Sequence, residues 1–240
     1  MIRAVTLDFW NTLADDYRLE ERQALRGARL RDVVEPYGYR PDDVDVGRAF
    51  SAAWDHFDRV WYEKHRTPVA AESTDVMLGA LGIRLPDDAR QHVVHMLERI
   101  VLETPPRPVE GVPETLPLLA ERYKLAVVCD AGMSPGSVLR EVLATQGLAR
   151  YFGAFFFSDE HGLSKPDPRA FHIPLAELDV APHDAVHVGD IQRTDIEGAH
   201  GAGLRAVHFV GINGRDLKRS SAEAVLYRFA DLPGVLDRLG

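Results

Sequence analysis

The chain lacks features that several classes of protein need. It has 240 residues and one cysteine, Cys129, so no disulfide can form within it, which fits a reducing compartment. No apolar run approaches the length of a membrane span, and no basic and apolar leader precedes the apolar residues that begin at Ile2. We therefore expect a cytoplasmic protein without a membrane partner.

Positive charge is also scarce. Lys and Arg number 28 against 37 Asp and Glu, which gives a formal net charge of -9 at pH 7 and disfavours a nucleic-acid partner. The composition, 45% hydrophobic and 27% charged, is ordinary for a soluble globular protein. We expect a small-molecule substrate and a monomer or homodimer. If that substrate is an anion, its site needs local positive charge, such as a divalent cation and a lysine, to offset the negative charge of the protein.

The first apolar segment ends in a carboxylate. Ala4–Leu7 is followed by Asp8, and the polar residues Asn11 and Thr12 come shortly after. A buried parallel strand has this pattern, with ligands bound beyond its carboxyl end. From this segment alone, a turn residue that caps a helix is an equally good interpretation of Asp8.

Residues 14–107 have the pattern of helices. Apolar residues recur there at helical spacing, and Pro or Gly follows each segment. The predicted helices are Asp15–Pro36, Pro41–His65, Ser73–Leu81 and Pro86–Leu102.

Residues 108–240 alternate between short apolar segments and helical ones, which indicates a parallel sheet with right-handed crossovers. The predicted strands are Leu125–Cys129, Ala154–Phe157, Ala185–Val188 and Ala206–Val210. The predicted helices are Pro113–Arg122, Ser134–Thr145, Pro168–Leu178 and Asp195–Gly203, with a last one in Ala222–Leu239. We expect Pro174 to disturb its helix.

The fold class that follows is α/β, with a discontinuous domain organisation. Residues 1–13 and 108–240 are predicted to form a Rossmann-like parallel sheet core, and residues 14–107 an inserted helical domain. Because the insert starts directly after Asp8, it is placed to cover whatever that residue binds. The alternative is an insert that only packs against the core.

Polar clusters follow four of the predicted strands. They are Asp8-Phe9-Trp10-Asn11-Thr12, Cys129-Asp130-Ala131-Gly132, Ser164-Lys165-Pro166-Asp167-Pro168 and Gly189-Asp190-Ile191-Gln192-Arg193-Thr194-Asp195. Each cluster alone has a simple structural explanation, such as a turn, a helix cap or a solvated lysine. Their shared position at strand ends predicts one site.

The chemistry of such a site is coherent. Asp8, Asp190 and Asp195 would crowd three carboxylates together, and a hard divalent cation such as Mg²⁺ relieves their repulsion. A carboxylate that attacks phosphorus would give an aspartyl-phosphate, with Lys165 neutralising the phosphoryl oxygens.

These clusters and the helical insert resemble the haloacid dehalogenase (HAD) superfamily over nearly the whole chain. The resemblance implies a Rossmann-like core with a C1-type helical cap. It also implies Asp8 as nucleophile and Mg²⁺ bound by Asp8, Asp190 and the backbone carbonyl of Trp10. Asp195 would then be a residue of the metal shell or a partner of Lys165.

The sequence departs from the phosphatase pattern at three positions. Trp10 stands where phosphatases of the superfamily have an Asp that acts as general acid. The loss of this acid matters little for acyl phosphates, anhydrides or aryl phosphates, whose leaving groups are stable without a proton. Cys129 replaces a Ser or Thr that binds phosphate, and a buried structural thiol is an equally good interpretation. Asp130 replaces an Asn, which suits a substrate phosphate poorly unless Asp130 faces the cap. Backbone amides of these segments, including those of Asn11 and Thr12, remain available to bind an anion.

Three other functions remain open. Trp10 also suits a 2-haloacid dehalogenase, in which an aromatic residue is common at that position and no metal is needed. A phosphonate hydrolase would use Lys64, the single lysine of the insert, as a Schiff base. A non-catalytic binding module with a degenerate site is the third. We favour a Mg²⁺-dependent hydrolase of a small phosphorylated metabolite.

Overall fold

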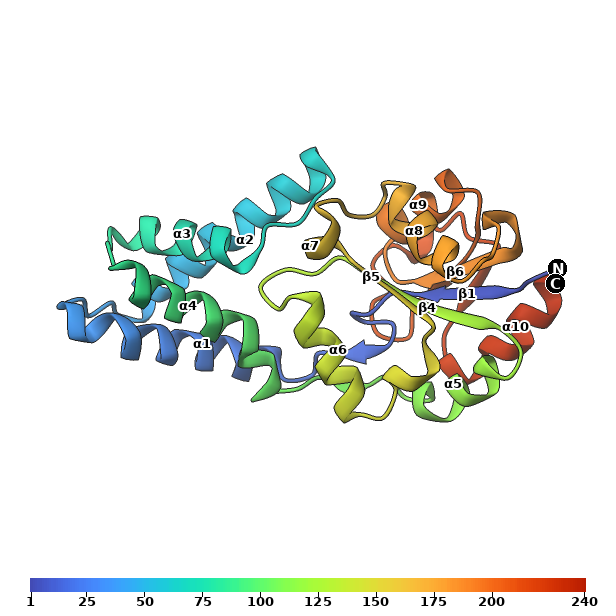
Figure 1. The fold of residues 1–240 in the computed structure, drawn as a ribbon, viewed down its shortest axis with the longest axis horizontal. Coiled ribbons are helices and arrows are strands. Elements are labelled where there is room, and N and C mark those ends of the chain that lie inside the picture. The colour runs from blue at the N-terminus through green and yellow to red at the C-terminus, as the bar shows by residue number, and fades with distance from the viewer.

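The computed structural model describes all 240 residues and has a central sheet of six parallel strands. Their order is β5-β4-β1-β6-β7-β8, and it confirms the predicted Rossmann-like α/β class (Figure 1). The strands are β1 (Ala4–Leu7), β4 (Lys124–Cys129), β5 (Ala154–Phe157), β6 (Ala185–Gly189), β7 (Arg205–Phe209) and β8 (Ala224–Leu226). Because β1 is central, its carboxyl end has β4 on one side and β6 on the other.

Helices cover both faces of the sheet because successive strand side chains point to opposite faces. Val5 and Leu7 pack under α5 (Val112–Ala120), α6 (Gly136–Thr145) and α10 (Leu232–Leu239). Ala4 packs with α8 (Arg169–Glu177) and α9 (Glu197–Gly201) on the other face. The short helix α7 (Ser158–His161) follows β5.

Four helices form an insert at the carboxyl ends of the strands, opposite the two termini (Figure 1). They are α1 (Leu19–Val34), α2 (Asp43–Lys64), α3 (Ala70–Leu81) and α4 (Asp87–Arg99). Asp42 caps α2 by accepting the Asp45 N–H at 2.8 Å, and Gly82 ends α3 in the left-handed conformation, with φ +66°. Leu30, Phe50, Met77 and other apolar residues of the helices form a hydrophobic cluster of their own.

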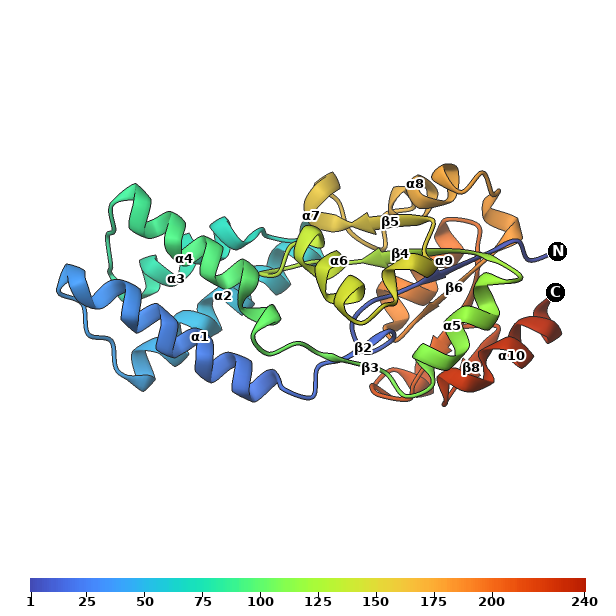
Figure 2. The same cartoon turned by 60° about the horizontal axis from the view of Figure 1, so that its bottom comes forward.

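Two short strands that the sequence pattern did not indicate join the insert to the core. β2 (Ala14–Asp15) pairs antiparallel with β3 (Arg107–Pro108), and Asp15 lies opposite Arg107 (Figure 2). Two residues are too few for an alternation of apolar and polar side chains to be visible. The chain therefore enters and leaves the insert at the same place.

Other differences concern element ends. The first helix begins at Leu19 rather than Asp15 and ends at Val34, where the 3-10 turn Glu35–Tyr37 follows. The last turn of the fourth predicted helix is likewise a separate 3-10 turn, Ile100–Leu102. The segment Gln192–Ile196 is a π-helical turn ahead of α9, and Pro174 lies within α8 without ending it. None of the helices combines the length and apolar character that crossing a membrane requires.

Candidate active site

Three carboxylates meet at the carboxyl ends of the central strands. Asp8 follows β1, Asp190 follows β6, and Asp195 lies in the turn ahead of α9. Each offers an oxygen within 4.8 Å of the others, and all three side chains are buried. The structure therefore brings together three carboxylates predicted from two separate segments, Asp8 from the first cluster and Asp190 and Asp195 from the fourth.

Lys165 lies between two of these carboxylates. Its Nζ is 2.5 Å from Asp8 Oδ1 and 2.7 Å from Asp195 Oδ1. Burial alone would lower the pKa of the Lys165 ammonium, but the surrounding carboxylates outweigh burial and raise it well above its ordinary value. Lys165 is therefore a fixed positive charge beside the predicted nucleophile.

Asp195 is held by contacts on both of its oxygens. Oδ1 also faces His187 Nε2 at 3.1 Å, and Oδ2 accepts the Ile191 N–H at 2.9 Å. Burial opposes ionisation of Asp195, yet Lys165 and His187 overcome it and lower the pKa of the carboxyl. His187 in turn faces Thr6 Oγ1 at 2.8 Å. Asp195 is thus a permanent anion that orients Lys165.

Asp190 has a different environment. Its Oδ2 accepts hydrogen bonds from Asn213 Nδ2 at 2.8 Å and from Asn11 Nδ2 at 3.3 Å. Burial and the nearby charge of Asp195 raise the pKa of Asp190 to about 6. The predicted residue Asn11 thus contacts this carboxylate, in a left-handed backbone conformation with φ 58°.

The three carboxylates fit a hard divalent cation. Burial, opposed by Lys165 but reinforced by Asp195 and Asp190, raises the pKa of Asp8 well above its ordinary value. A cation between these groups would remove the repulsion that favours protonation. The donors are carboxylate oxygens only, which suits Mg²⁺ better than a softer metal.

A cavity of ≈ 420 Å³ lies between this cluster and the insert. Loops of the core and helices α1 and α2 line it with residues of mixed character: Trp10, Asn11, Asp16, Leu19, Arg22, Gln23, Arg26, Trp54, Phe57, Asp130, Gly132, Met133 and Ser134. Its volume is that of a site for a small ligand. Trp10 and Asn11 connect the cavity to the strand end that carries Asp8.

Asp130 connects the core to the insert. Its Oδ1 accepts the backbone N–H of Lys165 at 3.0 Å, and its Oδ2 accepts Trp61 Nε1–H from α2 at 2.8 Å. Both oxygens of Asp130 therefore accept hydrogen bonds from the protein, and one of them is directed toward the insert. This orientation is the one expected of a carboxylate that does not repel a substrate phosphate.

The remaining predicted residues have these positions. Cys129 is fully buried among apolar side chains under α5 and α6, where burial raises the pKa of its thiol, and it is absent from the cavity lining. Thr12 is also buried, and its Oγ1 has no hydrogen-bond partner. Lys64 is exposed at the last position of α2.

Several residues near the site were not predicted. His187 was visible in the sequence as a polar residue inside an apolar strand, but Asn213 follows β7 in a loop without a distinctive pattern. Arg22 and Arg26 occupy the stripe of α1 that continues to Leu30, and both are buried. The sequence of the first predicted helix already placed these two arginines in line with its apolar residues, and this position was a signal that they are buried.

Arg193, a core residue beside the site, also contacts the insert by stacking on two aromatic rings of α2. Its guanidinium lies 4.4 Å from the Trp61 ring centroid and 4.2 Å from that of Tyr62. Met133, from the loop after β4, packs into the hydrophobic cluster of the insert.

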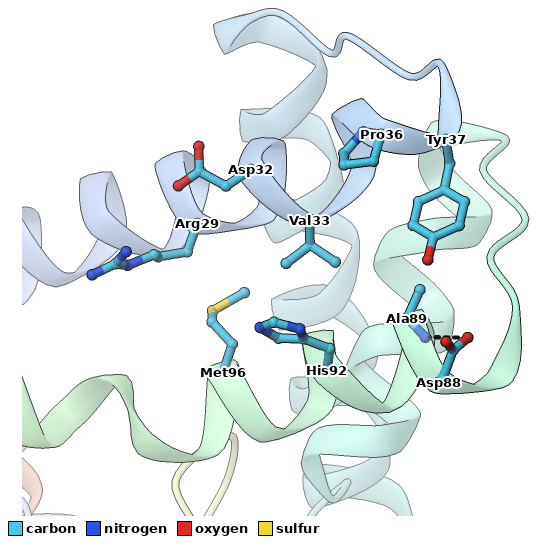
Figure 3. A pocket seen from close by; sticks show the side chains of 9 residues that line it. All are labelled: Arg29, Asp32, Val33, Pro36, Tyr37, Asp88, Ala89, His92 and Met96. Carbon is cyan, nitrogen blue, oxygen red and sulfur yellow. Dashed lines mark hydrogen bonds between the residues drawn. The ribbon is translucent and has the colours of Figure 1, made fainter.

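A second cavity, of ≈ 450 Å³, lies within the insert between α1 and α4 (Figure 3). Residues of those helices and the turn after α1 line it, among them Arg29, Tyr37 and His92. None of its lining residues belongs to the segments that carry the carboxylates. It is separate from the candidate site.

Comparisons with known proteins agree with this geometry. The chain is 42% identical to a phosphoserine phosphatase of Thermus thermophilus over 97 residues, which is 40% of this chain and 39% of the relative. It is 31% identical to a glyceraldehyde 3-phosphate phosphatase of Pyrococcus furiosus over 134 residues, which is 55% of each chain. The chain thus matches about two-fifths to just over half of the length of these relatives.

Solved structures match over greater lengths. A 2-haloacid dehalogenase from Pseudomonas syringae superposes with a TM-score of 0.73 and 27% identity, over 100% of both chains. A HAD phosphatase from Thermococcus onnurineus superposes with a TM-score of 0.68 and 22% identity, over 98% of both chains. Residues 2–203 match the family of haloacid dehalogenase-like hydrolases. The chain belongs to the haloacid dehalogenase-like hydrolase family.

Proposed function

We propose that the protein is a Mg²⁺-dependent phosphatase that hydrolyses a small phosphorylated metabolite through a phosphoryl group carried on Asp8. The observation that carries this proposal is the buried group of Asp8, Lys165, Asp190 and Asp195, with the Lys165 ammonium 2.5 Å from Asp8. The phosphatases among its relatives support the choice of phosphorus as the atom attacked.

The residues divide the work as follows. Asp8 attacks phosphorus with one oxygen, and the bond to the leaving oxygen breaks. Lys165 holds Asp8 in place and offsets the charge on the phosphoryl oxygens. Asp195 and His187 fix Lys165, and Asn11 and Asn213 orient Asp190. Water then releases phosphate from Asp8.

Asp8, Asp190 and the backbone carbonyl of Trp10 would hold Mg²⁺, with Asp195 in its outer shell. When bound, the cation supplies positive charge that offsets charge in the transition state and lowers repulsion among the carboxylates. We infer that Asn11, Thr12 and the segment after Cys129 contact the substrate from the core side.

Trp10 narrows the range of substrates. An indole N–H cannot protonate a departing alkoxide near neutral pH, so catalysis by a general acid, about 10²–10⁴-fold, is absent at this position. Acyl and aryl phosphates depend little on that proton. We therefore infer that the substrate has a stable leaving group, and that the helical insert acts as a cap over it.

The test is a comparison of wild type with Asp8→Asn on acetyl phosphate and p-nitrophenyl phosphate, with and without Mg²⁺. We expect Mg²⁺-dependent release of phosphate by wild type and a loss on the order of 10⁴-fold or more in the variant, as for other nucleophile replacements. Equal turnover by the two proteins would exclude Asp8 as the nucleophile.

A second candidate, a 2-haloacid dehalogenase, is favoured by Trp10 and by the full-length match to the Pseudomonas syringae enzyme. In that reaction Asp8 would attack carbon and release halide. The same two proteins are therefore tested on 2-chloropropionate. Halide release by wild type without added Mg²⁺, together with no phosphatase activity, would select this alternative.

A further inference from the structure

Two arginines of α1 are buried one turn apart, and their environments differ. Arg22 is 2% exposed and donates to Asp16 Oδ2 at 2.7 Å and to Thr104 Oγ1 at 3.0 Å. Arg26 is 4% exposed, no carboxylate lies within ion-pair distance of it, and its Nε has no hydrogen-bond partner. The second guanidinium is therefore a buried cation without a counter-charge.

Such a cation is unfavourable in a folded protein unless something compensates for it. A buried charge is normally paired, because removal from water costs several kcal/mol per ion. Asp16 is the acidic residue that interacts electrostatically with Arg26, but it already forms an ion pair with Arg22. Burial and the charge of Arg22 lower the pKa of Arg26 to about 10, so the guanidinium stays charged at neutral pH.

Arg26 also lies on the cavity between insert and core. The lining includes Trp10, Asn11 and Asp130 on the side of the carboxylate cluster, and the apolar Trp54 and Phe57 on the side of α2. Lys165 already supplies a cation beside Asp8. Arg26 is available for a different group of the same ligand.

We propose that Arg26 binds a second oxyanion of the substrate, a carboxylate or a further phosphate, while the reacting phosphoryl group lies at Asp8. This inference rests on the proposed phosphatase function and narrows its substrate class. The substrate is a small phosphorylated compound with a second anionic group, separated from the phosphate by an apolar part that packs between Trp10, Trp54 and Phe57.

A matched pair of substrates tests the proposal. 4-(Carboxymethyl)phenyl phosphate carries a distal carboxylate, and its methyl ester has nearly the same shape without the charge. Because a hydrogen bond between charged groups is strong, we expect wild type to have a KM about 10–100-fold lower for the acid than for the ester. Arg26→Gln is expected to abolish this preference by raising the KM for the acid to about that for the ester.

Control variants and a third probe sharpen the result. Arg29→Gln alters an exposed arginine of the same helix, paired with Glu103 at 3.0 Å, and is expected to keep the preference. Arg26→Lys, which retains the charge, is expected to restore part of it. 1,4-Phenylene bisphosphate distinguishes the two oxyanions: a KM below that of the carboxylate identifies phosphate as the preferred second group, and the reverse identifies carboxylate.

Thermal unfolding separates binding from a structural role. Since Arg26 has no partner to lose, Arg26→Gln is expected to leave the Tm unchanged or to raise it. A lowered Tm together with an equal loss of activity on all the probes would overturn the proposal, as would a wild type that does not discriminate between acid and ester.

A binding measurement keeps this inference separate from the proposed function. Calorimetry with 4-(carboxymethyl)benzylphosphonate and the methyl ester of its carboxylate needs no turnover. Wild type that hydrolyses no phosphate ester contradicts the phosphatase, yet carboxylate-dependent binding lost in Arg26→Gln still supports the role of Arg26. Equal binding of both phosphonates by wild type contradicts it.

Discussion

Lys165 contacts both Asp8 and Asp195, so one side chain balances the charge of two buried carboxylates. A buried ion group of this kind is strongly dependent on each member, because removal of one leaves the others without compensation. The same contacts place the ammonium where a phosphoryl group would meet Asp8. If Lys165 acts as proposed, both stability and catalysis depend on this one residue.

Replacement of Lys165 by Met is expected to lower the free energy of unfolding by about 3–5 kcal/mol in the absence of metal. Mg²⁺ is expected to recover part of this loss, since a cation can offset the same carboxylates. Urea denaturation with and without Mg²⁺ measures both effects. The exposed Lys64→Met serves as the control, and an unchanged unfolding midpoint in Lys165→Met would contradict the assigned charge balance.

If Asp190 is a ligand of Mg²⁺, as proposed, the binding of the cation depends on pH. The pKa of its carboxyl in the metal-free protein is raised to about 6, so below that pH the cation must displace a proton. The contribution of Asp190 to the Mg²⁺ affinity is expected to fall about tenfold per pH unit below pH 6 and to be constant above pH 7.

Calorimetric titration with Mg²⁺ at several pH values checks this expectation, with wild type compared to Asp190→Asn. The variant should bind weakly and should lack the pH dependence that Asp190 contributes. A wild-type affinity that does not change between pH 7 and pH 5 would be incompatible with a metal ligand of raised pKa.

Sequence patterns located the acidic residues and Lys165 because each follows an apolar strand, and parallel strands bring their carboxyl ends to one edge. The same patterns could not locate Asn213, which lies in an irregular loop and reaches Asp190 only through the tertiary fold. Arg26 was missed for another reason. Its place on the apolar stripe of the first helix was visible in the sequence, but a charged residue there is ordinarily assigned to solvent, and the fold shows that it is buried.

At the scale of elements, the turn after β6 depends on Gly189. A Cβ added there would lie 2.3 Å from Asp195 Cγ, so the strand end and the carboxylate can approach only because this residue has no side chain. The π-helical turn Gln192–Ile196 then places the Asp195 carboxylate in contact with the Lys165 ammonium. π-Helical turns are frequent at functional sites.

Gly189→Ala is expected to destabilise the protein by about 1–3 kcal/mol, as for other overpacked positions, and to weaken Mg²⁺ binding because Asp195 must move. Gly201→Ala is the matched control, since a Cβ at that position of α9 meets nothing within 4 Å. Thermal unfolding measures the destabilisation of each variant, and Mg²⁺ titration measures its affinity for the cation. Equal behaviour of the two would remove the steric argument.

The elements themselves differed in how well the sequence revealed them. Long helices with a regular apolar stripe, such as α2, and strands of continuous apolar residues, such as β4, were predicted with small errors at their ends. The strands β2 and β3 were not predicted, since their pairing depends on two segments far apart in the chain. Their position could be found only from the fold.

At the scale of the molecule, the insert contacts the core at the edge of the site. Trp61 of α2 donates to Asp130, and Asp130 also accepts the Lys165 N–H. The insert is therefore coupled to the segment that carries Lys165. We infer that movement of the insert away from the core would release this contact.

Trp61→Phe keeps an aromatic ring beside Arg193 and removes the hydrogen bond to Asp130. We expect a destabilisation of about 1 kcal/mol and a change in both KM and kcat on p-nitrophenyl phosphate, as for other contacts that govern closure. Steady-state kinetics and thermal unfolding measure the two effects. Trp54 lines the same cavity but donates no hydrogen bond to Asp130, so Trp54→Phe separates loss of closure from loss of substrate contact.

The pairing of β2 with β3 has a consequence for how this chain can be divided and rejoined. Asp15 and Arg107 lie side by side in antiparallel register, so the whole helical insert begins and ends at two residues that are neighbours in space. A two-residue hairpin turn could close the same gap. Genetic replacement of residues 16–106 by such a turn would uncover the edge of the sheet that carries Asp8. If the insert is a cap, as proposed, exchange of that segment between relatives is expected to change the choice of substrate while Asp8 stays in place.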